Sequence, residues 1–197
     1  WPFYFTLDEA RGVLYLPLAS PIPGYYGGDR AGANLYGNSV VAVTAETGEY
    51  LWHIHTIHHD LWDADPPAPP VLFDMERDGV TVPALGVTTK SGYLYILNRE
   101  TGAVLYDVEE RPVAASDVPG EVTYPTQPIP HKANGERMEP VSPVFPTDIP
   151  PEHAAGKRLL PQYTPLPAST RDVIFAPGYG GGASYGPISY SPDTGLL

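Results

Sequence analysis

The chain has 197 residues and contains no cysteine, which excludes disulfide bonds, zinc-thiolate sites and cysteine nucleophiles. It carries 23 acidic and 11 basic side chains, a formal net charge of −12 at pH 7, and its basic residues form no stripe. Because such a protein repels nucleic-acid phosphates, we expect no nucleic-acid binding. No run of about 18 or more apolar residues is present, so the sequence predicts no membrane span.

Proline and glycine favour turns, and the chain has 25 and 20 of them; its 14 tyrosines favour a packed core. Helical periodicity is nearly absent. These features predict an all-β fold of short strands: a sandwich, a barrel or a propeller. The strand-like segments, in chain order, are Phe3–Leu7, Gly12–Leu18, Ser39–Thr44, Tyr50–Thr56, Val80–Thr88, Tyr93–Leu97, Ala103–Val108, Val173–Pro177 and Tyr185–Tyr190.

An internal repeat favours the propeller among these folds. Residues Val41–Trp52 and Tyr95–Tyr106 both read as strand, Glu-Thr-Gly turn and strand, with an aromatic residue four positions after the glycine. A third, partial copy at Ser191–Leu197 resembles Asp8–Leu14. Because that last hairpin stops just after its turn, and the chain starts at Trp1, we expect a fragment of a longer protein, or a chain that has lost a leader.

The prediction for domain organisation is one partial propeller domain over residues 1–197. Residues 1–111 form strand-rich blades, residues 112–170 a proline-rich excursion, and residues 171–197 the start of the next blade. The excursion contains 13 prolines between Pro112 and Pro167, and proline removes donors from a strand ladder. It is either a flexible linker or a long ordered loop across the scaffold.

The segment His58–Asp65 gathers two imidazoles, one indole and three carboxylates directly after a strand-like run. Buried charges need partners, so such a cluster is typical of a functional loop at a strand end. Lys90 precedes another strand-like run, and Asp63 with Lys90 is the pair that we expect to carry chemistry. Taken without their context, Asp63 reads equally as a turn carboxylate and Lys90 as a turn lysine.

The histidines suggest a second site. His53, His55 and His58 follow the spacing of the His-x-His-x-Asp-His metal site of metallo-β-lactamase-like hydrolases. In this chain Ile57 occupies the position of the required aspartate, and the helices that flank the sheets of such hydrolases are not predicted. We therefore disfavour a dinuclear zinc hydrolase.

Three segments together resemble the quinoprotein dehydrogenases, which use pyrroloquinoline quinone (PQQ), and specifically the branch of membrane-bound glucose and quinate dehydrogenases. Members of this family have an eight-bladed propeller much longer than this chain, so the resemblance implies a few blades from its central part. The segments that carry the resemblance are Thr56–Asp63, the run Lys90–Gly102, and the pair Val108–Val113 and Tyr124–Pro128.

The resemblance implies roles for individual residues. Asp63 is the general base that accepts the hydroxyl proton of an alcohol, and Lys90 is the cation that contacts the quinone carbonyls. His59 is assigned to the cofactor contacts, or to orienting the neighbouring carboxylates. Ser184 and Tyr185 stand where the family carries an Asn-Trp pair that faces the cofactor.

The resemblance also implies a bound Ca²⁺ or Mg²⁺ that polarises the quinone, with Asp63 and Ser20 at its ligand positions. Family members carry Gly-Asn where this chain has Ala19–Ser20. A hydroxyl is a weaker ligand for a hard cation than an amide carbonyl. This departure, and that at Ser184–Tyr185, favour the alternative function, a non-catalytic propeller module for binding or scaffolding that has lost its cofactor.

The implied function is a PQQ-dependent oxidoreductase that oxidises a sugar, a polyol or another alcohol by base-assisted hydride transfer. Its electrons leave to ubiquinone or another acceptor, and the full-length protein is periplasmic and membrane-associated. Because an open propeller exposes sheet faces and unpaired edges, we expect contacts with the remaining blades or a homo-oligomer.

Overall fold

The computed structural model describes residues 4–141, 148–169 and 171–197. The all-β prediction is confirmed: the described part of the chain is almost entirely strand and turn, with one helix of a single turn. The elements are β1 (Thr6–Asp8), β2 (Val13–Pro17), β3 (Ser39–Thr44), β4 (Tyr50–His55), β5 (Val71–Arg77), β6 (Val80–Thr88), β7 (Leu94–Asn98), β8 (Val108–Pro112), β9 (Thr126–Pro130), α1 (Pro151–Ala154), β10 (Arg158–Leu160) and β11 (Val173–Phe175).

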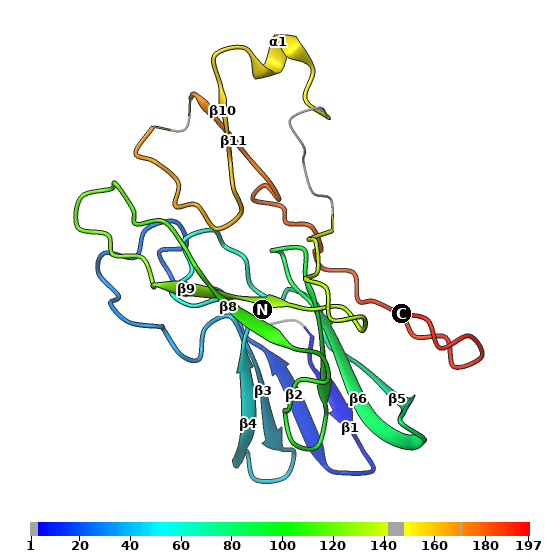
Figure 1. The fold of residues 1–197 in the computed structure, drawn as a ribbon. Coiled ribbons are helices and arrows are strands. Elements are labelled where there is room, and N and C mark those ends of the chain that lie inside the picture. The colour runs from blue at the N-terminus through cyan, green and yellow to red at the C-terminus, as the bar shows by residue number, and fades with distance from the viewer. Residues whose placement is uncertain (1–3, 142–147, 170) are drawn as a thin grey trace.

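Two antiparallel meanders form the body of the structure (Figure 1). The first has the strand order β1-β2-β3-β4 and the second the order β5-β6-β7, and β1 and β5 are in contact. Strands β8 and β9 form a separate antiparallel hairpin, while β10 and β11 pair in parallel. Consecutive strands that pair in order, sheet after sheet, are what neighbouring blades of a propeller require. The partial propeller is therefore the architecture of this chain.

The internal repeat corresponds to one repeated turn geometry. In the first copy the amide of Gly48 donates to the carbonyl of Thr44 at 2.9 Å, and in the second Gly102 donates to Asn98 at 2.9 Å. The third copy has the same bond, from Gly195 to Ser191 at 2.8 Å. All three glycines have φ between 69° and 74°, a region in which a side chain is strained.

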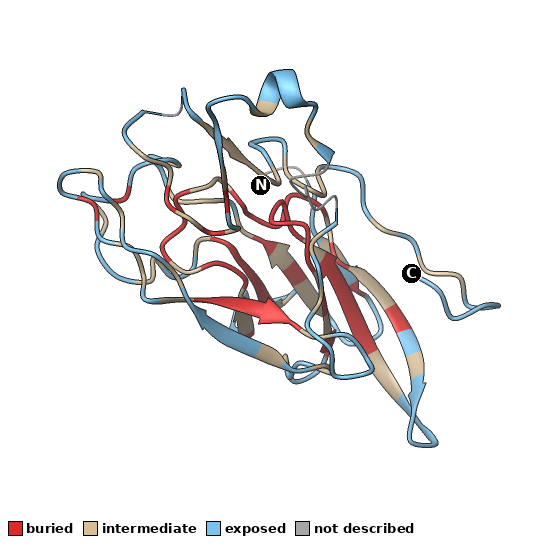
Figure 2. Cartoon of the chain, turned by 45° about the horizontal axis from the view of Figure 1, so that its top comes forward, coloured by how far each residue is buried: buried red, intermediate tan, exposed pale blue. Residues whose placement is uncertain are grey.

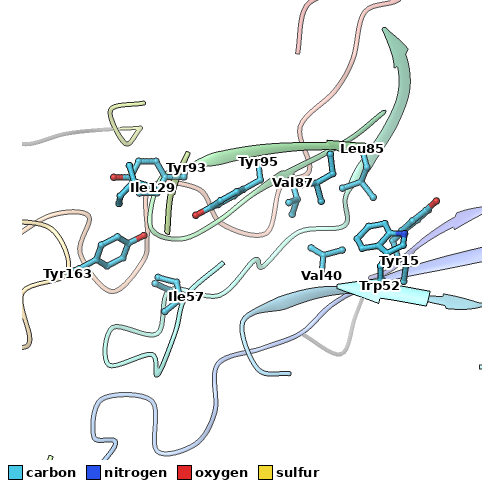
Figure 3. Packing of buried hydrophobic residues seen from close by; sticks show 13 residues of the cluster. Tyr15, Val40, Trp52, Ile57, Leu85, Val87, Tyr93, Tyr95, Ile129 and Tyr163 are labelled. Atoms are coloured by element: carbon cyan, nitrogen blue, oxygen red, sulfur yellow. The ribbon is translucent and has the colours of Figure 1, made fainter. Parts of the chain in front are cut away.

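The aromatic residue of the first repeat packs between the two meanders. Trp52 of the first sheet is buried, and a Cβ added at Gly102 would lie 2.7 Å from its indole. Tyr15 also packs on Trp52, with ring centroids 5.7 Å apart. Figure 3 shows Val40 of β3 facing Leu85 and Val87 of β6 in the same core.

Burial follows this core (Figure 2). Strand β3, the second half of β6 and the loop after β4 are mostly buried, whereas α1 and the C-terminal tail are exposed. Helix α1 and strands β10 and β11 lie together at the end of the molecule opposite the turns β1–β2 and β3–β4 (Figure 1). The loop after β4 is thus largely buried, which is unusual for a loop and indicates that its polar groups are paired.

Several predicted strands have the expected bounds within one or two residues, and two do not exist. The segment Tyr185–Tyr190 is irregular because it contains a proline and joins no ladder, and Tyr190 instead packs on Phe73 at 4.7 Å. Residues 103–107 form only an isolated bridge, Leu97 with Val104, and Val108 begins β8. The predicted Phe3–Leu7 strand begins at Thr6, and Phe3 lies outside the described residues. Strands β5, β8, β9 and β10 were not predicted.

Candidate active site

A buried carboxylate, Asp60, organises the loop between β4 and β5. It is fully buried and accepts hydrogen bonds from the amides of Trp62 at 2.8 Å and Ala64 at 2.9 Å. The Nδ2 of Asn38 donates at 2.8 Å, and the hydroxyl of Ser20 donates at 2.5 Å. Burial raises the pKa of Asp60, while each of these four donors favours its ionised form. The loop conformation therefore depends on Asp60.

Asp63 and Asp65 together hold the ammonium group of Lys90. The Nζ of Lys90 lies 2.9 Å from Oδ2 of Asp63 and 2.9 Å from Oδ1 of Asp65. Lys90 and Asp65 are 6% and 1% exposed, whereas Asp63 is 32% exposed. Asp63 adopts φ 56°, a left-handed conformation that Asp and Asn tolerate best. The structure thus brings together Asp63 and Lys90, which the sequence predicted as a catalytic pair, and places Asp65 on the same ammonium group.

The electrostatics of this triad keep Lys90 charged. Burial lowers the pKa of Lys90, but the hydrogen bonds to Asp63 and Asp65 outweigh it, and the net shift is upward. Burial raises the pKa of Asp65, against the stabilising effect of Lys90. The charged Lys90 therefore lies between two carboxylates, Asp63 and Asp65. Of these two, Asp63 is the one that solvent reaches.

The glycine-rich run Gly178–Gly186, near the C-terminus, packs on the backbone of Lys90. The amide of Gly182 donates to the carbonyl of Lys90 at 2.8 Å. A Cβ added at Gly181 would lie 2.6 Å from Cβ of Lys90, so only glycine fits there. This run carries Ser184, which is half-buried, and Tyr185, which is 53% exposed. A cofactor contact by Ser184 or Tyr185 stays a prediction.

His59 joins the segment His58–Asp65 to the loop 27–32. Its Nδ1 lies 2.8 Å from the carbonyl oxygen of Gly32, and its Nε2 is pressed against Gly27. The imidazole is 2% exposed, and within the described residues its Nε2 has no hydrogen-bond partner. A cofactor contact by His59 also stays a prediction.

The metal-ligand position predicted at Ser20 lies inside the Asp60 cluster. The hydroxyl of Ser20 donates to Asp60, accepts from Asn38 at 3.1 Å and lies 3.3 Å from Oδ1 of Asp65. Across residues 4–141, 148–169 and 171–197, no group of three or more His, Asp or Glu side chains is arranged to hold a metal ion. Metal binding by Asp63 and Ser20 stays a prediction.

The proline-rich excursion returns to the site, which the sequence did not locate. Trp62 donates its indole N–H to the carbonyl of Thr164 at 2.9 Å, and its ring packs on Tyr163 at 5.4 Å. Gln162 binds the same region, because its Nε2 donates to the carbonyl of Ser91 at 2.7 Å. These residues help to line an open pocket of about 30 Å³ beside Lys90. Residues 162–164 of the excursion therefore contact the two segments that carry Trp62 and Ser91.

His55, at the end of β4, and His58, in the loop that follows, form a pair. Nδ1 of His55 lies 2.9 Å from Nδ1 of His58, whose Nε2 lies 2.9 Å from Oε1 of Glu110. Gln127 is fully buried and clamps the His58 backbone, with its Oε1 accepting at 2.9 Å from the amide and its Nε2 donating to the carbonyl. These contacts join the β8–β9 hairpin to the loop.

We expect His55 to make stability pH-dependent. Burial lowers the pKa of His55 to about 4, with repulsion from His58 and His53 acting in the same direction and Glu110 opposing them. The unfolded state therefore takes up the proton first. The stabilisation that comes from the neutral His55 is complete above about pH 6.5 and is lost as the pH falls towards 4. Between pH 7 and 5 the free energy of unfolding therefore falls by about 2 kcal/mol. Urea unfolding across this range should show a shallower pH dependence for His55→Asn. The exposed His153→Asn is the matched control; an unchanged slope in His55→Asn would contradict the expectation.

The sequence and the fold now identify the family. The family model "PQQ: Glucose/ethanol/alcohol dehydrogenase, beta-propeller domain" matches residues 1–197, the whole chain. The chain belongs to this family. This match confirms the resemblance to the quinoprotein dehydrogenases that was based on His58–Asp63 (HHDLWD) and Lys90–Gly102.

The chain is similar to several curated dehydrogenases with different named substrates. The quinoprotein glucose dehydrogenase of Gluconobacter oxydans is 36% identical over 146 residues, 73% of this chain and 18% of that protein. The glycerol dehydrogenase large subunit of Gluconobacter thailandicus is 35% identical over 206 residues, 98% of this chain and 27% of that protein. A probable quinate dehydrogenase (quinone) of Xanthomonas campestris pv. juglandis is 43% identical over 126 residues, 63% of this chain and 16% of that protein.

Solved quinoprotein structures show the same fold. A quinohemoprotein alcohol dehydrogenase of Pseudomonas putida superposes with a TM-score of 0.61 at 24% identity, over 96% of this chain and 24% of that chain. A europium-containing methanol dehydrogenase gives a TM-score of 0.61 at 22% identity, over 98% of this chain and 28% of that one. The chain thus spans about a quarter or less of the length of these members of the family. Within its described residues, no helix is long and apolar enough to cross a membrane.

Proposed function

We propose that this chain forms part of a PQQ-dependent oxidoreductase that oxidises a sugar, a polyol or another alcohol. The observation that carries the proposal is the contact between Asp63 and Lys90, 2.9 Å apart, at the exposed end of a triad in which Asp65 is buried. A carboxylate that solvent reaches, beside a buried cation, is what base-assisted oxidation of an alcohol requires.

The residues present fit one end of a quinone cofactor. Lys90 supplies a cation for a quinone oxygen, and the Cβ-free backbone of Gly181 closes against it. Trp62 and the exposed ring of Tyr185 are aromatic faces from the two segments that meet at Lys90. The cavity beside Lys90, about 30 Å³, holds a water molecule or two, so the fit concerns these side chains and not a complete pocket.

Each residue of the triad has a separate task in the proposed reaction. Asp63 accepts the proton of the substrate hydroxyl, and bound PQQ would supply the acceptor for the hydride. The ammonium of Lys90 stabilises negative charge that develops on an oxygen beside it. Asp65 remains ionised and paired with Lys90 when Asp63 takes up its proton. Lys90 therefore stays charged and in place throughout the cycle.

A divalent cation is a separate part of the proposal. The Ser20 hydroxyl is engaged with Asp60, and the described part of the chain gathers no set of three or more carboxylate or imidazole ligands. We propose Asp63 and Ser20 as the positions at which Ca²⁺ or Mg²⁺ would bind.

The partners follow from the relatives and not from this chain. Relatives named glucose, glycerol and quinate dehydrogenases support a sugar, polyol or related alcohol as the substrate. Transfer of the electrons to ubiquinone or another acceptor, and a periplasmic, membrane-associated full-length protein, are part of the proposal. So are contacts with remaining propeller blades or with a second copy of the chain.

A second candidate function is a non-catalytic binding or scaffold module. The engagement of Ser20 with Asp60 favours it, because a metal-ligand position of the family is then used structurally. Retention of both Asp63 and Lys90 in contact speaks against it, since a scaffold does not require a half-exposed acid beside a buried cation.

The test is a titration of the intact protein with PQQ, with excess Ca²⁺ or Mg²⁺ and without either. Because Trp62 lies at the site, we expect saturable quenching of tryptophan fluorescence together with a change in PQQ absorbance. Reduction of a redox dye with a panel of sugars and polyols then identifies the alcohol. Binding without turnover of any alcohol would favour the scaffold, and absence of PQQ binding by the intact protein would overturn the proposal.

A further inference from the structure

One turn of the proline-rich excursion, residues 161–164, bridges the two loops of the candidate site. The amide of Thr164 donates to the carbonyl of Pro161 at 3.1 Å and closes the turn. Within the turn Tyr163 has φ 58°, a conformation in which a bulky side chain is strained. Since such a conformation persists where the surrounding structure fixes it, we expect the contacts of this turn to be specific.

On one side the turn holds the residue that precedes Asp63. Trp62 donates its indole N–H to the carbonyl of Thr164 at 2.9 Å, and its ring packs on Tyr163 with centroids 5.4 Å apart. Tyr163 is 6% exposed, so this contact is part of the core. The indole is thus fixed both by its polar group and by its ring, and the backbone that continues into Asp63 is fixed with it.

On the other side Gln162 holds the residues that follow Lys90. Its Nε2 donates to the carbonyl of Ser91 at 2.7 Å, and its Oε1 accepts from the hydroxyl of Tyr93 at 2.6 Å. Tyr93 is 3% exposed, and its ring lies 6.4 Å from that of Tyr163 (Figure 3). Both polar ends of the amide are therefore engaged, and the connection between β6 and β7 is clamped to the excursion.

We propose that Gln162 is a positioning residue for Lys90, and that the turn 161–164 thereby sets the separation of Lys90 from Asp63. This inference rests on the proposed function. The amide of Lys90 donates to the carbonyl of Asp65 at 3.0 Å, and Gln162 adds a support on the C-terminal side of Lys90. Proton transfer and charge stabilisation depend on fixed geometry, and a displacement of about 1 Å can cost about 100-fold in rate.

The kinetic test compares Gln162→Met with Gln127→Met in the intact protein. Methionine is unbranched and adapts to the space of a glutamine, so each change removes two hydrogen bonds and keeps most of the packing. We expect kcat of Gln162→Met to fall about tenfold while KM changes less than about twofold, because Lys90 acts in the chemical step. Gln127 makes the equivalent clamp on His58. Its variant should lose melting temperature and keep kcat within about twofold.

The chemical reactivity of Lys90 separates this inference from the proposed function. Lys90 is 6% exposed, and Lys132, which is 45% exposed, serves as the reference within the same protein. Reductive methylation followed by mass spectrometry measures the labelling rate of each lysine, whether or not any alcohol is oxidised. Loss of the clamp lets the connection open locally, so we expect Lys90 to react about tenfold faster in Gln162→Met and at the wild-type rate in Gln127→Met.

Three outcomes would overturn the proposal. Unchanged labelling of Lys90 in Gln162→Met would mean that the clamp does not hold Lys90. Equal acceleration in Gln162→Met and Gln127→Met would mean that both glutamines serve the fold alone. Unchanged kcat of Gln162→Met in an active protein would mean that the chemical step does not depend on this support. If the wild type oxidises no alcohol but Lys90 reacts as expected, the proposed function fails and the support of Lys90 by Gln162 stands.

Discussion

Asp63→Asn is expected to lower kcat for alcohol oxidation by about 10³-fold, within the range that a positioned general base contributes. The carboxamide has nearly the shape of the carboxylate and still accepts a hydrogen bond from Lys90, but it is not a base at neutral pH. Asn also tolerates the left-handed conformation at this position, φ 56°. The measurement is steady-state kinetics with dye reduction, together with the melting temperature and the affinity for PQQ.

The control for Asp63→Asn is the same change at Asp78. Asp78 is exposed in the turn between β5 and β6 and has φ 53°, so it shares the backbone conformation but not the site. Asp78→Asn should keep full activity. A drop in kcat of Asp63→Asn that merely followed a loss of folded protein would show up in the melting temperature. Wild-type turnover in a folded Asp63→Asn protein would contradict the assignment of the base.

Much of the fold follows from local sequence signals. The Glu-Thr-Gly turns could be predicted because a positive φ at Gly48 and Gly102 demands glycine, and strand alternation flanks each turn. Strands β3 and β6 have the bounds that the sequence predicts. Strand β5 was not found in this way, since its alternation of apolar and charged residues covers only four positions, Phe73 to Glu76.

Two other segments contradict their local sequence preference. Strand β9, Thr126–Pro130, contains two prolines and exists because its partner β8 and the clamp of Gln127 on His58 hold it. Tertiary contacts of this kind override the local preference of proline against strands. Conversely, Tyr185–Tyr190 has the aromatic content of a strand but finds no ladder partner, and its Tyr190 is used for packing on β5.

The candidate site was predictable where the motif is contiguous. Asp63 and Lys90 are 27 positions apart, and the resemblance to quinoprotein dehydrogenases was needed to pair them; the structure places them 2.9 Å apart. The inward partner, Asp65, was not assigned a contact with Lys90. Tyr163 and Thr164 come from the proline-rich excursion, and no local pattern shows that this segment returns to Trp62. Contacts between distant irregular segments leave no periodicity in a sequence, which is why they were missed.

The second large effect is expected for Lys90→Met, this time on stability as well as turnover. Lys90 is 6% exposed and is the counter-charge of Asp65, which is 1% exposed. Removal of the ammonium leaves a buried carboxylate unpaired, which costs about 3–5 kcal/mol. The comparison is Lys132→Met, because the ion pair of Lys132 with Glu136 is exposed on both sides and contributes little. Urea unfolding of both variants measures the difference.

A paired substitution separates the burial of charge from the chemistry of the site. Lys90→Met with Asp65→Leu replaces the buried ion pair by apolar side chains of similar size, and such exchanges are often neutral for stability. We therefore expect the double variant to recover most of the unfolding free energy lost in Lys90→Met. Turnover should not return, since Asp63 then lacks the cation beside it and a developing negative charge has no counter-charge. Recovery of turnover along with stability would show that Lys90 is a structural lysine, and that the buried pair with Asp65 serves the fold alone.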